Sequence, residues 1–291
     1  MGRFFCFAVS SDREALSVNP DAQKLVFCGQ KPHSIGMSGE EKNVGLFVTC
    51  LVDLFRPTVA FAAVKLMSEA GCSICVPERQ TCCGQPAFNS GDRHDARKMA
   101  EMVIEEFEKF DYVVAPSGSC AAMIKKHYPE LFSDQADWHK RALDLSRKTY
   151  ELMSFLTDVL DVKEVETTLN RKVTYHDSCS GLRELGIKDQ PRTLMNAVEG
   201  LDLVEGENAE RCCGFGGTFC LKYSDISTRI ADDKCDDILK TEADMVLGGD
   251  LGCLMNIAGR LTRRGETVEV RHVAEVLAGM CDDVAPISRK G

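Results

Sequence analysis

Eight cysteines, arranged in two matching sets, are the strongest candidates for a chemical role in this sequence. Each set has a single cysteine, then an adjacent pair followed by glycine, then another single cysteine. The sets are Cys50, Cys82, Cys83 and Cys120, followed by Cys179, Cys212, Cys213 and Cys253. Soft thiolate ligands select zinc or iron–sulfur clusters. The sequence therefore predicts one four-thiolate metal site in each half of the chain.

The two sets keep almost the same spacing along the chain. Between Cys50 and Cys82 lie 31 residues, and between Cys179 and Cys212 lie 32. Equivalent cysteines are offset by 129, 130 and 133 residues, which indicates a duplicated unit. Buried cysteines that serve only as core residues would not need this shared register. The repeat therefore favours metal binding over simple packing.

The composition narrows the class of protein. The chain has 291 residues, of which 44% are hydrophobic and 27% charged, as in ordinary soluble globular proteins. A net charge of -10, without a large basic cluster, argues against nucleic acid as a partner. The longest apolar stretch, residues 58–67, is too short to cross a bilayer, so we expect no membrane span.

The number of cysteines bears on the cellular compartment. The chain contains 15 cysteines, but it is long for a disulfide scaffold and has no clear secretory leader. This combination favours a reducing, cytoplasmic location, where clustered cysteines bind metal more often than they form bridges.

The order of predicted elements indicates an α/β fold with two tandem domains, each a small parallel sheet flanked by helices. Strands are predicted at residues 43–49, 72–78 and 111–117, and again at 171–178, 201–206 and 243–249. Helices are predicted at 57–70, 92–110, 136–160, 190–198, 224–242 and 253–264, and residues 268–279 read as a strand turning into a helix. The expected domains are an N-terminal extension (1–42), a first domain (43–135), a linking helix (136–171) and a second domain (172–291).

In both units the cysteines follow predicted strands directly. Open parallel sheets place their sites at the carboxyl ends of strands, so three loops should converge on one site in each domain. Both sulfurs of an adjacent pair can face one site only across a tight turn, since neighbours on a strand point to opposite faces. We expect Gly84 and Gly214 to make that turn, because glycine tolerates positive φ.

The passages that carry these cysteines resemble the cysteine-rich CCG domain. That domain occurs in heterodisulfide reductase, in the iron–sulfur subunit of glycolate oxidase and in the lactate-utilisation protein A family. The resemblance spans residues 44–280. It is closest to the lactate-utilisation family in the segments TCCGQPAFNSG, YHDSCSGLRELGIKDQPR, CCGFGGTF and DLGCLMNIAGRL.

This resemblance implies a cytoplasmic iron–sulfur subunit of a three-protein complex that oxidises L-lactate to pyruvate. Its partners would be a ferredoxin-type iron–sulfur protein and a smaller third subunit. The eight cysteines would hold one or two iron–sulfur clusters of the [4Fe–4S] type, and zinc in one domain stays open. The alternatives are a redox subunit like those of heterodisulfide reductase or glycolate oxidase, and a zinc-stabilised assembly protein with no redox role.

One departure from the family pattern bears on the kind of cluster. The heterodisulfide reductase pattern ends in CxxC, but the first of these positions is Ser117 in one unit and Asp250 in the other. Four thiols therefore remain in each unit. This number favours an ordinary four-thiolate cluster over a non-cubane one that cleaves disulfides.

Other residues near these loops have two possible roles. His176 and Asp177 could tune a metal through hydrogen bonds to its ligands or relay a proton, or they could merely cap the next turn. Arg183 and Arg192 are candidates for binding a carboxylate substrate. Cys72 and Cys75 form a CxxC, but we expect their odd spacing on a strand to send them to opposite faces as core residues. Candidate sites in the first 36 residues, Cys6 and Cys28, carry little weight.

Overall fold

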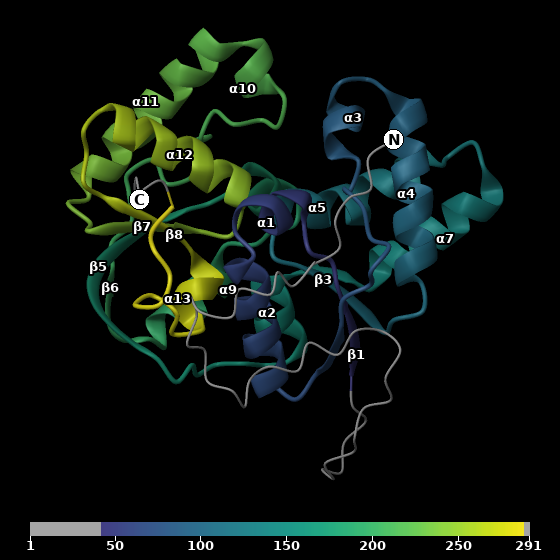
Figure 1. Cartoon of the computed structure of the whole chain (residues 1–291), viewed down its shortest axis with the longest axis horizontal. Coiled ribbons are helices and arrows are strands. Elements are labelled where there is room, and N and C mark those ends of the chain that lie inside the picture. Colours follow the sequence, from purple (N-terminus) through teal and green to yellow (C-terminus); the bar gives the residue numbers. More distant parts are fainter. Residues whose placement is uncertain (1–41, 288–291) are drawn as a thin grey trace, which may run out of the picture.

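The computed structural model describes residues 42–287, which form two four-stranded parallel sheets (Figure 1). The first sheet has the order β2-β1-β3-β4 and the second the order β6-β5-β7-β8. The strands are β1 (Asn43–Leu46), β2 (Ser73–Cys75), β3 (Tyr112–Ala115), β4 (Thr149–Glu151), β5 (Thr168–His176), β6 (Glu199–Leu203), β7 (Met245–Gly248) and β8 (Glu269–His272). The second order repeats the first, strand for strand. The predicted tandem α/β fold is therefore confirmed.

The register of the strands carries the same repeat. Val44 in β1 pairs with Tyr112 in β3, and Val173 in β5 pairs with Met245 in β7. Because these pairs are offset like the cysteines, the whole sheet was duplicated together with its loops.

Helices connect the strands and cover the sheets. In the first half they are α1 (Cys50–Phe55), α2 (Thr58–Glu69), α3 (Gln85–Asn89), α4 (Arg93–Phe107), α5 (Gly118–Ala122), the π-helix η2 (Met123–His127), α6 (Tyr128–Leu131), α7 (Ala136–Arg147), α8 (Leu152–Ser154) and the π-helix η3 (Phe155–Val159). In the second half they are the π-helix η4 (Ser180–Glu184), α9 (Asp189–Asn196), α10 (Phe219–Lys222), α11 (Ser224–Lys240), α12 (Leu251–Arg263) and α13 (Val273–Leu277).

The prediction of one helix over residues 136–160 was wrong. The helix α7 ends at Arg147, and Thr149–Glu151 then form β4, which pairs with β3 at the edge of the first sheet. A three-residue strand is too short to show period-two alternation, so tertiary pairing decides it. Residues 136–171, expected as a link, thus supply a strand of the first sheet.

Helix α4 illustrates how sequence produces these elements. The Asp92 carboxylate accepts a hydrogen bond from the Asp95 amide at 3.1 Å and caps the helix start. Its buried residues are Ala96, Ala100, Val103, Ile104 and Phe107, which recur at helical spacing on one face. That stripe packs against the first sheet.

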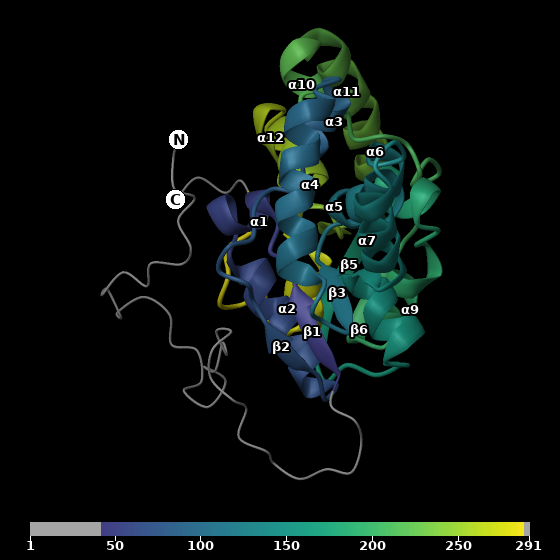
Figure 2. The same cartoon turned by 90° about the vertical axis from the view of Figure 1, so that its right-hand side faces the viewer.

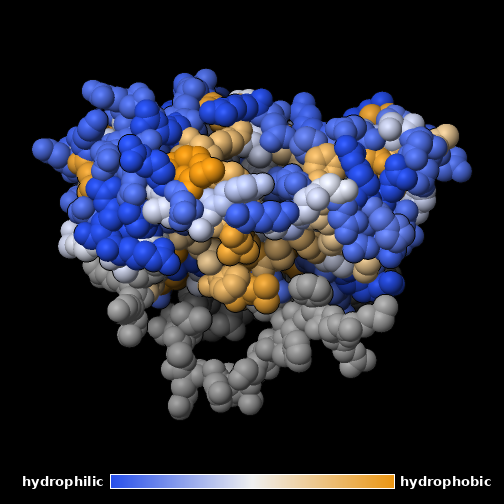
Figure 3. Space-filling model, turned by 90° about the horizontal axis from the view of Figure 1, so that it is seen from above, coloured by the Kyte–Doolittle hydropathy of each residue, from blue (hydrophilic) through white to orange (hydrophobic). Residues whose placement is uncertain are grey.

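The loops that follow the strands gather at one end of the molecule. Figures 1 and 2 show α3, α10 and α11 together at this end. Seen from there, apolar residues gather in the middle of the surface and hydrophilic residues lie to either side of them (Figure 3). On α1, Leu54 and Phe55 are each 62% exposed.

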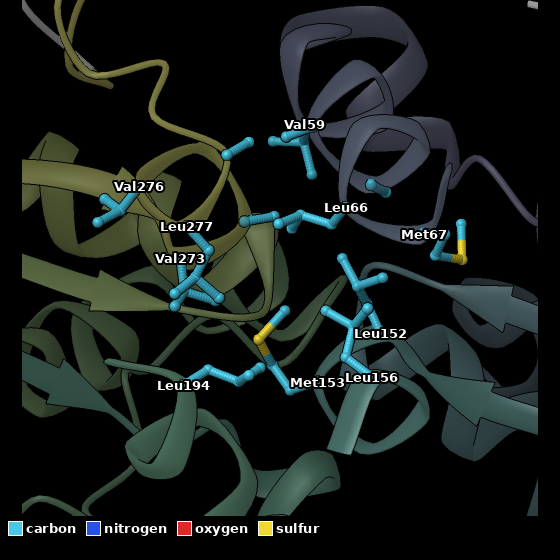
Figure 4. Packing of buried hydrophobic residues seen from close by; sticks show 14 of the residues in the cluster. Val59, Leu66, Met67, Leu152, Met153, Leu156, Leu194, Val273, Val276 and Leu277 are labelled. Atoms are coloured by element: carbon cyan, nitrogen blue, oxygen red, sulfur yellow. The ribbon is translucent and has the colours of Figure 1, made fainter. Parts of the chain in front are cut away.

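A core shared by both halves lies between the two sheets. It includes side chains of α2, α8, η3, α9 and α13 (Figure 4). Here α2 packs on α13, and α9 packs on α8 and η3. Each half also has an outer core, formed around α4 and α7 in the first and around α11 and α12 in the second.

Two expectations concern the ends of the chain and the membrane. Residues 1–41 of the expected extension (1–42), with Cys6 and Cys28, lie outside the described residues. Within residues 42–287, no helix combines the length and the apolar character needed to cross a bilayer.

Candidate metal centres

The structure brings the predicted cysteines together at the carboxyl edge of each sheet. In the first half, Cys50 begins α1 after β1, the Cys82–Cys83 pair follows β2, and Cys120 lies in α5 after β3. In each sheet the connections diverge to either side of the first strand, and open parallel sheets form their binding crevice at that point. All eight cysteines of the two sets are unbridged thiols.

The first site, which we call centre 1, is a compact set of four sulfurs. The Sγ atoms of Cys50 and Cys82 lie 3.8 Å apart, and those of Cys83 and Cys120 lie 3.5 Å apart. Gly84 has φ +84° directly after the pair, as the sequence predicts. The Tyr128 hydroxyl donates to the Cys83 carbonyl at 2.9 Å and fixes the turn.

The second site, centre 2, is built in the same way. Gly214 also has φ +84°, and its amide lies 3.3 Å from the Cys212 Sγ to which it donates. The Phe215 amide donates to the Cys213 Sγ at 3.4 Å. In place of a tyrosine, the Asn256 side chain donates to the Cys213 carbonyl at 2.8 Å.

The crowded thiols affect one another's ionisation. Hydrogen bonds from Cys50 and Cys83 lower the pKa of Cys82, and those from Cys179 and Cys213 lower the pKa of Cys212. The pKa values of the donor thiols are raised by the same contacts and by burial. One thiolate per centre is thus favoured, and its neighbours disfavour a second negative charge unless a cation shares the site.

Centre 2 contains a histidine that centre 1 lacks. His176 ends β5 with only 1% of its surface exposed, and neither ring nitrogen has a hydrogen-bond partner among the described residues. One nitrogen lies within 4.8 Å of the Sγ atoms of Cys213 and Cys253. Burial, and then the positive charge of Lys234, lower the pKa of His176 to about 3. Its imidazole is therefore neutral and has a free lone pair.

Phe47 occupies the equivalent position beneath centre 1. It is fully buried and packs on Phe107 with ring centroids 5.5 Å apart. The same scaffold position is thus apolar in one half and a nitrogen base in the other.

Sequence reasoning missed the buried cation Lys234. Its ammonium donates to the carbonyls of Asn208 at 3.3 Å and Ala209 at 2.8 Å, and lies 3.7 Å from the Asp237 carboxylate. The equivalent residue in α4 is Val103. Gly84 contacts Ala96 as Gly214 contacts Ser227, and Val103 and Lys234 each lie seven residues further along their helix. A lysine on the apolar stripe of the predicted helix 224–242, three residues after Ala231, was the signal that could have identified it.

Asn256 and Tyr128 were missed as well. Asn256 lies three residues after Cys253 on the same helix, so spacing alone places it on the same face. No such spacing relation points to Tyr128.

The two positions that lack a family cysteine meet each other across the seam between the halves. The Ser117 hydroxyl donates to the Asp250 carboxylate at 3.2 Å, and the Ser119 amide donates to it at 2.9 Å. Both Ser117 and Asp250 are buried. These residues therefore join the starts of the two ligand-bearing helices α5 and α12.

Other candidates have structural partners. Arg192 does not face an open carboxylate site, because both carboxylate oxygens of Asp177 accept from it at 2.9 and 2.8 Å, and Glu205 does so as well. Cys72 and Cys75 belong to different core clusters, as their odd spacing predicted.

A small pocket opens at the seam between the two centres. Its walls include Glu151, Tyr175, Asp177 and Gly249. Burial raises the pKa of Glu151 to about 8, so this carboxyl is mainly protonated at neutral pH. The lining residues of the pocket include no cationic side chain.

The fold and the paired cysteine loops define a tandem CCG protein. The model of the cysteine-rich CCG domain matches residues 44–125 and 173–258. Lactate utilization protein A of Anoxybacillus flavithermus is 51% identical over 235 residues, which cover 81% of this chain and 98% of that protein. The Geobacillus kaustophilus protein of the same name is 50% identical over 234 residues, 80% of this chain and 98% of its own. The chain belongs to the lactate utilization protein A family.

One further relative has the same family name, and one solved structure shares the fold. Lactate utilization protein A 2 of Bacillus cereus is 47% identical over 235 residues, 81% of this chain and 97% of that one. Among solved structures, a hypothetical protein from Helicobacter pylori has the same fold, with a TM-score of 0.62 at 10% identity. That match covers 86% of this chain and 52% of the other.

Proposed function

We propose that this protein is an iron–sulfur electron-transfer subunit of a complex that oxidises L-lactate to pyruvate. The observation that carries the proposal is the pair of four-thiol sets, each gathered from three loops at the carboxyl edge of a sheet. Cys50, Cys82, Cys83 and Cys120 would hold one cluster, and Cys179, Cys212, Cys213 and Cys253 the other. When bound, such clusters accept and donate single electrons.

The donor sets fit a metal group. Each centre offers four sulfur ligands with no bridging disulfide, and soft thiolates are the ligands that iron–sulfur clusters take. The amides of Gly214 and Phe215 donate to sulfur, and hydrogen bonds of this kind set the potential of a cluster. The protein's own contribution is thus to hold the ligands and to adjust the centre's potential.

The lactate assignment is supported by relatives about half identical to this chain and named lactate utilization proteins. We propose a cytoplasmic complex with a ferredoxin-type iron–sulfur protein and a smaller third subunit. Exposed Leu54 and Phe55, on the helix that begins at Cys50, offer an apolar contact surface beside centre 1.

A second candidate function, a zinc-stabilised assembly protein without redox activity, is favoured by the sulfur distances. A single tetrahedral ion with metal–sulfur bonds of about 2.3 Å holds its sulfurs about 3.8 Å apart. The pairs in centre 1 lie at 3.8 and 3.5 Å. A four-iron cluster, in which each thiolate binds a different iron, requires the sulfurs to move apart.

Anaerobic purification separates the two candidates. Iron with acid-labile sulfide and a broad visible absorption would support the redox subunit. Stoichiometric zinc in a colourless protein would support the assembly protein.

The fuel is tested with the complete complex. Lactate, but not glycolate, should reduce an acceptor when the partner chains are present. A complex that responds to glycolate and ignores lactate would refute the lactate assignment and leave the metal centres untouched.

A further inference from the structure

We propose that His176 is a direct nitrogen ligand of the metal at centre 2, so that the two centres have different ligand sets. The inference rests on the proposed function only in requiring that centre 2 binds a metal. It holds for iron and for zinc, since imidazole suits both.

Within residues 42–287, the His176 imidazole has none of the hydrogen-bond partners that a buried polar group needs. A buried polar group without a hydrogen bond costs roughly 1–3 kcal/mol, so native proteins seldom retain one without cause. His176 has two such atoms, Nδ1 and Nε2, in a side chain that is 1% exposed. A metal bound to one nitrogen would satisfy the lone pair of that nitrogen.

The position of His176 also fits a ligand. One ring nitrogen and the Sγ atoms of Cys213 and Cys253 lie within 4.8 Å of one another. Ligands of one tetrahedral ion are separated by roughly 3–4 Å, given metal–nitrogen and metal–sulfur bonds of about 2.0–2.3 Å. A small shift of side chains therefore brings all three donors to a common metal atom. A histidine that acted only through another residue would not need to lie so close to the two sulfurs.

Centre 1 serves as an internal control. Phe47 stands at the position of His176, in the same place beneath the sulfurs, and packs in the outer core. An aromatic hydrocarbon satisfies the fold at this position, so packing alone does not require imidazole. The imidazole nitrogen in centre 2 therefore needs another explanation, and binding a metal provides one.

A nitrogen ligand has a chemical consequence. Neutral imidazole replaces or adds to negatively charged thiolates, and substitution of histidine for cysteine raises the reduction potential of iron–sulfur centres. With iron bound, this ligand set would make centre 2 the easier of the two centres to reduce.

The test reads the metal's surroundings rather than activity. Full-length protein carrying Cys83→Ser, which disables centre 1, is purified anaerobically, and X-ray absorption is measured at the edge of the bound metal. We expect a nitrogen shell at about 2.0–2.1 Å beside the sulfur shell. His176→Phe, which copies Phe47, should remove that shell and weaken metal binding at least tenfold in a chelator competition.

Two further variants keep the result interpretable. His176→Gly should lose the nitrogen shell and regain it when free imidazole is added, which a folding defect would not do. His272→Asn, at another fully buried histidine of the same domain, should leave the shell unchanged.

The outcomes are distinct. A sulfur-only shell in the parent protein, or a nitrogen shell that persists in His176→Phe, overturns the inference and spares the proposed function. Absence of any metal in anaerobic wild-type protein overturns both. A negative lactate assay removes the proposed fuel and leaves the histidine ligand standing.

Discussion

The side chains packed beneath the sulfurs of the two centres differ far more than the loops that carry the cysteines. Both centres keep the same cysteine register, the same glycine turn and the same strand order. Beneath the sulfurs, however, Phe47 and Val103 in the first half correspond to His176 and Lys234 in the second. Duplication preserved the cysteine loops, while the side chains packed beneath them diverged. Equal ligand loops therefore do not imply equal chemistry.

The largest expected effect tests whether the two centres load independently. Cys83→Ser and Cys213→Ser each remove one buried thiolate from one centre. Each variant should lose roughly half of the bound metal and destabilise its own half, because metal binding free energy is also folding free energy. Metal analysis and thermal unfolding measure both effects. Full metal content in Cys213→Ser would show that this residue is not a ligand.

The second prediction concerns the equivalent residues Val103 and Lys234. Val103→Lys places an ammonium in an apolar core without a partner and should cost about 3–5 kcal/mol. Lys234→Met removes hydrogen bonds to two carbonyls but leaves Asp237 bonded to the Asn208 amide at 2.9 Å, so we expect about 1–3 kcal/mol. Denaturant unfolding gives both values. Equal losses of unfolding free energy would mean that the surroundings of the two positions are interchangeable.

The third prediction concerns two equivalent helix caps with opposite pH dependence. Glu151 accepts from the Met153 and Ser154 amides at the start of α8, and His272 accepts from the Ala274 amide at the start of α13. Burial, with smaller effects of Asp250 and Asp158, raises the pKa of Glu151 to about 8 from about 4.5. Burial lowers the pKa of His272, although Glu275 and Asp250 oppose the shift.

The signs follow from these shifts. Folding favours protonated Glu151, so its stabilisation is complete below about pH 4.5 and is lost as the pH rises to about 8, at about 1.4 kcal/mol per pH unit. Folding favours neutral His272, so its stabilisation is present above about pH 6.5 and is lost as the pH falls. The test measures the unfolding free energies of Glu151→Gln and His272→Asn from pH 5 to 9. Each variant should lose the pH dependence that its own residue contributes. Parallel pH profiles for wild type and Glu151→Gln would contradict the first assignment.

The smallest expected difference lies in the glycine turns. Alanine at either Gly84 or Gly214 must adopt a left-handed conformation, which costs about 1–2 kcal/mol. At Gly214 the added Cβ would also lie 2.6 Å from the Ser227 carbonyl oxygen, against 3.3 Å from the Ala96 carbonyl oxygen at Gly84. Gly214→Ala should therefore be the more damaging change by about 1 kcal/mol or more in chemical denaturation. The reverse order would mean that α11 moves aside more readily than α4.

Much of the fold could be predicted because its signals are local. The cysteine spacing revealed the duplication, and alternating strands and helices gave the parallel sheets. The strand β4 was not predicted because three residues are too few to show an alternating pattern. It forms through its tertiary pairing with β3. The site was predicted to the extent that it depends on cysteine and glycine. Lys234 could have been found from its place on the apolar stripe of a predicted helix. The contact between Ser117 and Asp250 depends on how the two halves pack, which one sequence does not reveal.

The contacts between the halves are reciprocal. α2 meets α13, and their counterparts α9 and α8 meet in turn, while Ser117 touches Asp250, its own counterpart. Residue i contacts j and j contacts i only where a two-fold axis relates identical surfaces. We infer that the fused chain preserves the geometry of an ancestral homodimer, in which a single repeat paired with its own copy before one gene encoded both.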